Sequence, residues 1–185
     1  MFNDRSAPLP FLATRRSGKP RDLGAPGPSG QELDRICALA ARTPDHGKLA
    51  PWRFVVVEDR DRLARTLSDA FRTERPGVGD AATIEQFAHQ APALVVVLSS
   101  PKDGPIPVWE QELSAGAAIM NLLHAANALG YAGGWLTGWA AYSDIVLGAF
   151  GAAPERIAGF VFIGTPTRPL EERPRPDMEQ LISRW

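Results

Sequence analysis

Residues 113–143 form a stretch of 31 residues that contains no aspartate, glutamate, lysine or arginine. A helix that is apolar on every side must be covered on every side, by lipid or by protein. Asn121, His124 and Asn127 interrupt the stretch and its flanks are acidic, which argues against a membrane span. We therefore expect a helix over residues 108–129 that is buried inside a protein or between two subunits.

The size and charge of the chain indicate one domain, residues 1–185, that does not bind nucleic acid. Of its 185 residues 44% are hydrophobic, so the chain can bury a proper core. The 20 basic and 21 acidic residues give a formal net charge of −1, without the basic excess that binds phosphate backbones. Cys37 is the single cysteine, which excludes a disulfide framework. We expect a cytoplasmic protein that enters no membrane.

Helix and strand signals alternate along the chain. Ser29 followed by Glu32 is a capping-box pattern, which predicts a helix that starts there and ends before Pro44. Residues 93–99 are apolar without alternation, so we expect a strand that is covered on both faces. The whole pattern predicts an α+β, or α/β-like, fold with a small mixed but mostly antiparallel sheet flanked by helices. The other expected helices are 9–14, 59–72, 80–89 and 143–150, and the other expected strands are 54–57, 131–136 and 157–164.

Generic catalytic patterns are weak in this chain. The three histidines have no spacing that suggests a shared ion, so we expect no metal site. No G-x-S-x-G motif supports a serine nucleophile. The glycines between residues 130 and 138 follow a helix and lack the G-x-G-x-x-G spacing, which argues against a dinucleotide-binding loop. We therefore predict no catalytic side chain.

A cluster of cations near the N-terminus is suited to binding an anion. Arg15, Arg16, Ser17 and Lys19 place three positive charges and a hydroxyl within five residues. A forked guanidinium group matches a phosphate with two parallel hydrogen bonds. Runs of charge more often simply face water, so a solvated basic turn is the alternative interpretation.

Two further segments combine polar groups with large aromatic residues. Residues 42–52 end a helix, carry several polar groups and enter a strand at Trp52; an ordinary helix-to-strand loop is the alternative. Trp109 lies at the start of the expected helix over residues 108–129, and residues 133–138 place another tryptophan among small residues. Most tryptophans pack in cores, and core packing is the alternative for this pair.

Taken together, these segments resemble the FMN-dependent nitroreductase family, in particular its small bacterial members, over about residues 12–164. The family's opening R-[RH]-S-x-K pattern is met by residues 15–19. Its P-S-S-x-N-x-Q-P-W loop has the same length as residues 44–52. This loop keeps Pro44, Pro51 and Trp52, and it departs from the family at Asp45, His46, Lys48 and Ala50.

Two later landmarks continue the resemblance in the same order. Residues 125–138 resemble the family's small-residue helix end and the strand after it. Residues 160–166 resemble its final strand and turn. Each landmark alone is unspecific, and the resemblance rests on four of them in order over most of the chain.

The resemblance implies an interlocked homodimer that holds an FMN at each of two equivalent sites in the interface. Residues 165–185 would form a C-terminal arm that packs on the partner subunit. Arg15, Arg16 and Ser17 would bind the phosphate and ribityl chain of FMN, with Lys19 at the pyrimidine edge of the ring. The other implied FMN contacts are Arg168 at the phosphate, Arg42, Pro44, His46 and Lys48 from the other subunit, and Trp135, Leu136 and Thr137 beside the ring.

The resemblance also implies a reaction. NADH or NADPH would reduce the flavin, which would pass the electrons to a small electron-poor acceptor such as a nitroaromatic or a quinone, by a ping-pong mechanism. Two alternatives stay open: an enone reductase or dehydrogenase on the same scaffold, and an FMN-binding redox or flavin-storage protein without significant turnover. Weaker expectations are Trp52 and Trp109 as walls of a substrate pocket, and Ala125, Ala126, Asn127, Ala128, Leu129 and Gly130 as a nicotinamide site.

Overall fold

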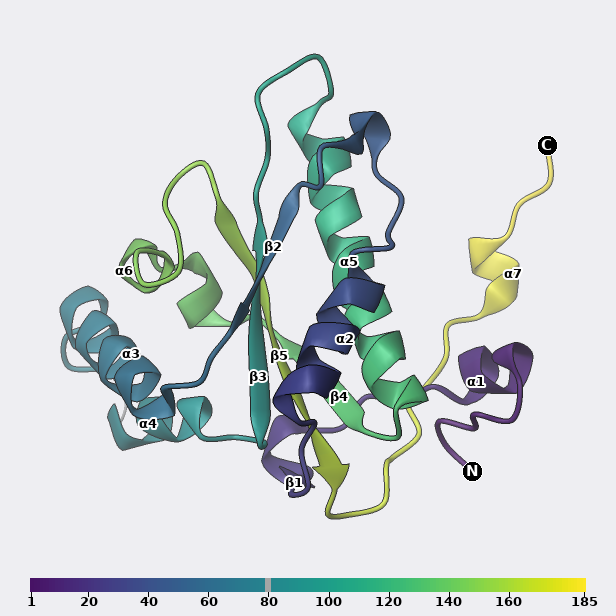
Figure 1. Cartoon of the computed structure of the whole chain (residues 1–185), viewed down its shortest axis with the longest axis horizontal. Coiled ribbons are helices and arrows are strands. Elements are labelled where there is room, and N and C mark those ends of the chain that lie inside the picture. The colour runs from purple at the N-terminus through teal and green to yellow at the C-terminus, as the bar shows by residue number, and fades with distance from the viewer. Residues whose placement is uncertain (79–80) are drawn as a thin grey trace.

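A computed structural model describes residues 1–78 and 81–185 of the chain. Helices cover both faces of one central sheet (Figure 1). The strands are β1 (Leu23–Gly24), β2 (Trp52–Val56), β3 (Ala93–Ser99), β4 (Ala132–Leu136) and β5 (Arg156–Pro166). The helices are α1 (Pro8–Thr14), α2 (Gly30–Ala40), α3 (Arg60–Glu74), α4 (Ala81–Ala88), α5 (Val108–Ala128), α6 (Asp144–Leu147) and α7 (Met178–Leu181), and short 3₁₀ turns lie at Pro20–Asp22, His46–Lys48 and Trp139–Tyr142.

The sheet has five strands in the order β1-β5-β3-β2, and β4 also pairs with β5. β5 is the longest strand, and it pairs with β3, β4 and β1. Every pairing in the part of the chain that the structure describes is antiparallel. The predicted α+β fold with flanking helices is therefore confirmed, whereas the expectation of a mixed sheet is wrong. Apolar patterning marks strands but carries no information on their direction.

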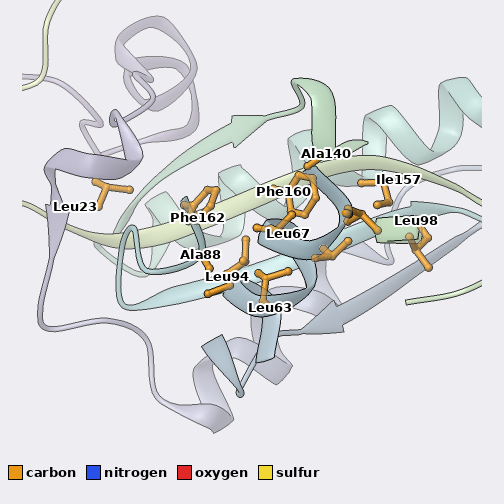
Figure 2. Packing of buried hydrophobic residues seen from close by; sticks show 14 of the residues in the cluster. Leu23, Leu63, Leu67, Ala88, Leu94, Leu98, Ala140, Ile157, Phe160 and Phe162 are labelled. Atoms are coloured by element: carbon orange, nitrogen blue, oxygen red, sulfur yellow. The ribbon is translucent and has the colours of Figure 1, made fainter. Parts of the chain in front are cut away.

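Two apolar cores lie on opposite faces of the sheet, because successive side chains of a strand point to opposite sides. Every residue of β3 is buried, as its unbroken apolar sequence predicts. Figure 2 shows the first core, in which Leu63 and Leu67 of α3 pack on Leu94 and Phe162. The second core places α2 and α5 on the other face, and its central members are Ile36, Val95, Val97, Ile119, Leu122, Val161 and Ile163.

Side-chain and backbone caps fix the ends of the helices that frame the second core. The Ser29 hydroxyl accepts the backbone N–H of Glu32 at 3.3 Å, and the Glu32 carboxylate accepts the backbone N–H of Ser29 at 2.8 Å. This capping box starts α2 where the sequence predicts it. At the end of α5, Gly130 has a φ of +100°, and the N–H of Tyr131 reaches back to the carbonyl of Ala126 at 3.0 Å. These two features form a Schellman motif, which turns the chain directly into β4.

The long helix α5 is buried on one side only. Ala115, Ala118, Ile119 and Leu122 have no exposed surface on the inner face. On the outer face, the side chain of Leu113 is 60% exposed in the single chain. No helix among the described residues is long and apolar enough to cross a membrane. The apolar stretch thus covers one core and leaves a second apolar face uncovered.

One predicted helix is shorter in the structure. Residues 143–150 are expected to be helical, but α6 covers only Asp144–Leu147: Gly148 is its C-cap, and the N–H groups of Ala149 and Phe150 reach only three residues back. Ser143 caps its start by accepting the N–H of Val146 at 3.1 Å. Asp80, the expected start of another helix, lies outside the described residues; the following helix α4 begins at Ala81. The remaining predicted elements are present within a few residues of their expected ends.

Residues 167–185 leave the sheet as an extended arm. Figure 1 shows the arm running past α1, with α7 standing apart from the sheet. Prolines prevent a regular helix before α7, as the sequence predicts. Met178, Leu181, Ile182 and Trp185 on the far part of the arm are all exposed. The arm therefore carries apolar side chains that its own subunit does not cover.

Candidate functional site

A cavity of about 550 Å³ lies between the N-terminal segment, β4 and the start of the C-terminal arm. This volume falls within the range of small-molecule and cofactor pockets. Four parts of the chain form its walls. They comprise residues 15–22, Met120 and Leu123 of α5, Gly134, Trp135 and Leu136 of β4, and Arg168, Pro169, Leu170, Glu171 and Arg173 of the arm.

Glycines allow the N-terminal segment to lie directly on β4. The backbone N–H of Gly18 donates to the carbonyl of Gly133 at 3.0 Å. A Cβ atom added at Gly134 would stand 2.5 Å from the carbonyl oxygen of Gly18 and 3.1 Å from the ring of Pro20. Only glycine fits at this close approach. It places the cations of residues 15–19 beside the strand that forms the floor of the cavity.

Arg15 is a partly buried cation without a carboxylate partner. In the described part of the chain no carboxylate lies within 4 Å of its guanidinium, which instead donates to the Ser17 hydroxyl at 3.3 Å. Burial, together with the positive charges of Arg16 and Arg175, holds the pKa of Arg15 below its usual value. Several cations that repel one another around a cavity create a field that attracts an anion. Arg15 and Ser17 are therefore a candidate pair for binding an anion.

Arg16 and Lys19 line the same cavity but are held by the arm. The Nε and Nη2 atoms of Arg16 donate to the carbonyl of Glu171 at 2.8 and 2.6 Å, and its Nε lies 3.3 Å from the Glu172 carboxylate. The Arg16 side chain is only 11% exposed. Lys19 Nζ lies 2.7 Å from the Glu171 carboxylate. Both predicted anion ligands thus have partners in the single chain.

The predicted residues of β4 and the arm also reach the cavity. Trp135 donates its indole N–H to the carbonyl of Ala158 at 3.0 Å, lying over Gly159, where a Cβ atom would collide with the indole. Leu136 lines the cavity, and Thr137 follows the end of β4 without lining it. Arg168 lines the cavity with its Nε 3.8 Å from the Asp22 carboxylate.

The loop residues expected to reach FMN from a second subunit do not line this cavity. Pro44 and His46 are held beside α5 by polar contacts. His46 Nδ1 lies 2.9 Å from the Glu110 carboxylate, and Ser114 donates to the carbonyl of Pro44 at 3.3 Å. Arg42 and Lys48 are exposed. Within one chain, the structure therefore brings together the residues 15–19, 135–136 and 168, but not the loop.

Two of the weaker expectations are corrected by burial. Trp52 is 8% exposed and packs against Ala115 and Ala118 under α5, so it is a core residue of this subunit and not an open pocket wall. Within the expected nicotinamide segment, the inward-facing residues are buried and its last residues form the Schellman motif that ends α5. The buried members are Ala125, Ala126 and Asn127, while Ala128, Leu129 and Gly130 are less buried but do not line the cavity. Trp109, by contrast, is 62% exposed near the start of α5.

Sequence reasoning missed several residues of the cavity wall. Gly18 and Gly134 lie in the two segments that were singled out for other residues. A glycine in such a segment can indicate that two backbones approach closely. Met120 and Leu123 belong to a helix whose faces are alike in sequence, so nothing marked them. Arg173 lies in the arm, whose position depends on contacts across the chain.

No group of three or more potential metal-binding side chains occurs among residues 1–78 and 81–185.

We expect His124 to make the stability of the protein depend on pH. Burial and the charge of Arg15 hold its pKa below 6.5, and its ring packs edge-on against Phe11 at 5.4 Å. The unfolded chain therefore takes up a proton more readily as the pH falls through 6.5, and the folded protein loses stability below that pH. His124→Gln removes this part of the fall in melting temperature between pH 7 and pH 5. His89→Gln, the same change at an exposed position, leaves the fall in place; an equal effect of both variants would contradict the assignment.

The geometry defines an α+β protein with a cofactor-sized, anion-attracting cavity at the edge of an antiparallel sheet, and comparison with known proteins identifies the family. Residues 12–165 match the model of the Nitroreductase family. A protein of Haemophilus influenzae named "Putative NAD(P)H nitroreductase" is 37% identical over 162 residues, covering 85% of this chain and 87% of the relative. The Escherichia coli K12 protein "Putative NAD(P)H nitroreductase YdjA" is 35% identical over 164 residues, with the same coverage.

Solved structures agree in fold. A nitroreductase-like family protein from Bacillus cereus superposes with a TM-score of 0.80 at 20% identity, covering 94% of this chain and 93% of that one. A structure described as a nitroreductase in complex with FMN, from Desulfovibrio desulfuricans, superposes with a TM-score of 0.69 at 20% identity, covering 89% and 90%. The chain belongs to the nitroreductase family, and it is an oxidoreductase of the NAD(P)H nitroreductase type.

Proposed function

We propose that this protein binds FMN in the cavity and transfers reducing equivalents from NADH or NADPH to a small electron-poor acceptor, such as a nitroaromatic or a quinone. The observation that carries the proposal is Arg15, a partly buried cation without a carboxylate partner among the described residues, beside the Ser17 hydroxyl. The family membership and the names of its relatives support the same reaction class.

The residues around the cavity fit an FMN molecule by shape and by charge. The phosphate needs a cationic hydrogen-bond donor, which Arg15 supplies; the Ser17 hydroxyl adds a neutral donor, and Arg168 lines the same cavity. The ring needs an apolar surface, which Leu136 of β4 and Met120 and Leu123 of α5 offer in the cavity lining. The cavity volume of about 550 Å³ accommodates a cofactor of this size.

The protein's own residues bind and orient in this proposal. Bound FMN would supply the chemistry, taking two electrons from the nicotinamide and giving them to the acceptor. Arg15 and Ser17 would fix the phosphate, and Lys19 would add positive charge at the edge of the ring. Met120 and Leu123 would exclude water from the inner wall. No side chain needs to act as a nucleophile, in keeping with the weak catalytic patterns in the sequence.

We also propose that the functional unit is a homodimer. The exposed apolar face of α5 and the apolar end of the arm are the support for this, because surfaces of this kind are normally covered. A second subunit would bring its loop at residues 42–48 toward the cavity and complete the site. Light scattering at micromolar concentration should give a mass near 40 kDa, about twice the 20.0 kDa of one chain. A stable mass near 20 kDa would contradict the dimer.

Turnover tests the reaction itself. The FMN-loaded protein is mixed anaerobically with NADH and, separately, with NADPH, and the flavin absorbance is followed in a stopped-flow instrument. We expect one or both nucleotides to bleach the flavin band, and a nitroaromatic or quinone added afterwards to restore it. A flavin that neither nucleotide reduces would indicate a binding or storage protein. Reoxidation by an enone but by neither nitroaromatic nor quinone would favour the enone reductase.

A further inference from the structure

The arm places two carboxylates at the cavity that we assign to the FMN phosphate. Glu171 lines this cavity directly. Its carboxylate lies 2.7 Å from Lys19 Nζ, and the pKa of Glu171 is held below its usual value by that hydrogen bond, so the group is charged at neutral pH. The Glu172 carboxylate lies 3.3 Å from Arg16 Nε. The arm thus presents negative charge to Arg16, which is expected at the phosphate and ribityl chain, and to Lys19, which is expected at the edge of the ring.

These contacts are what holds this part of the arm to the body of the protein. Residues 171–185 are exposed throughout. Within the described part of the chain, the hydrogen bonds and ion pairs from residues 171–185 to the rest of the molecule all go to Arg16 and Lys19. Arg16 and Lys19 are therefore the residues that hold this segment to its own subunit in the described structure.

We infer that Glu171 and Glu172 are an internal competitor for the flavin site, which occupies Arg16 and Lys19 in the flavin-free protein and must give way when FMN binds. This inference rests on the proposed function, because it concerns the same cavity. A phosphate carries more charge than one carboxylate and offers more acceptor oxygens, so it displaces the arm. FMN binds only molecules in which the arm has left Arg16 and Lys19. Its apparent dissociation constant is therefore the intrinsic one divided by the fraction of such molecules.

The expected size of the effect is modest. Exposed ion pairs stabilise weakly because water and salt screen them. Two such pairs, Lys19–Glu171 and Arg16–Glu172, should therefore lower the affinity for FMN by about fivefold. Riboflavin lacks the phosphate and cannot replace the carboxylate charge, so its affinity should depend much less on the arm.

The test compares dissociation constants by flavin fluorescence titration of the full-length apoprotein. The double variant Glu171→Gln and Glu172→Gln should bind FMN about fivefold more tightly than the unmodified chain. Its affinity for riboflavin should change by less than about twofold. Glu179→Gln removes the same charge from the exposed helix α7, which makes no ion pair with the cavity in the described structure, and it should leave both affinities unchanged.

A second measurement follows the arm itself. In the unmodified protein, saturating FMN should accelerate cleavage by a glutamate-specific protease after Glu171 and Glu172, and riboflavin should not. Unchanged or weaker FMN binding in the double variant, an equal gain for riboflavin, or cleavage that FMN slows would each overturn the inference. In those cases the proposed function still stands if Arg15→Ala lowers FMN affinity. Failure of every variant and of the unmodified chain to bind FMN would overturn both.

Discussion

Arg15→Ala should weaken FMN binding by roughly 1.5–3 kcal/mol, which raises the dissociation constant about 10- to 150-fold. The reason is that a hydrogen bond to a charged group is lost in a partly buried cavity, where Arg15 has no carboxylate among the described residues to release in exchange. The apoprotein should fold normally, because removing a guanidinium that other cations repel costs little. Fluorescence titration with FMN measures the effect.

Two further variants serve as controls for the Arg15→Ala result. Arg15→Lys keeps the charge but loses the fork that matches two phosphate oxygens, so it should lie between the alanine variant and the unmodified chain. Arg62→Ala removes the same charge from an exposed position of α3, on the other face of the sheet, and should not change the FMN affinity. If Arg15→Ala bound FMN as tightly as the unmodified chain, the phosphate site would be wrongly assigned.

Gly134→Ala should destabilise the fold by about 1–3 kcal/mol, which lowers the melting temperature by about 2–4 °C for each kcal/mol. The added Cβ would stand 2.5 Å from the carbonyl oxygen of Gly18, and a backbone atom cannot move aside as a flexible side chain can. The segment that carries Arg15 must therefore lift away from β4. We expect the content of bound FMN to fall at least about tenfold as a consequence, since the cations no longer face the cavity.

Gly30→Ala is the control for the glycine prediction. A Cβ at Gly30 meets nothing within 4 Å, and the residue is the first of α2. Alanine there should change the stability by less than about 1 kcal/mol and leave FMN binding intact. Calorimetry and the flavin absorbance of the purified protein provide both readouts. A Gly134→Ala protein that matched the unmodified chain in melting temperature and in FMN content would refute the close approach of the two segments.

The features that sequence predicted well are those with a local physical cause. The capping box at Ser29 and Glu32 starts α2 because each side chain satisfies a backbone N–H of the other. The unbroken apolar run of β3 becomes a strand that is buried on both faces, since it has no polar side to turn to water. The cations of residues 15–19 and the glycine-containing strand β4 line one cavity, and their role as FMN ligands stays a prediction.

The features that sequence did not predict depend on contacts between distant parts of the chain. Glu171 and Lys19 are 152 residues apart, and no local pattern pairs them. A tryptophan such as Trp52 can be either a core residue or part of a pocket wall. Only its packing under α5 shows that it belongs to the core. The exposed face of α5 looks like its buried face in sequence, so the sequence could not say which side would remain open.

The central claim is that the protein holds FMN by its phosphate at Arg15 and Ser17, with the flavin ring along β4. A crystal structure of the protein grown with FMN tests this claim most directly. We expect the phosphate oxygens within hydrogen-bond distance of the Arg15 guanidinium and the Ser17 hydroxyl, and the ring over Gly134, Trp135 and Leu136. Electron density for FMN at any other place, with no FMN at these residues, would contradict this assignment of the FMN site.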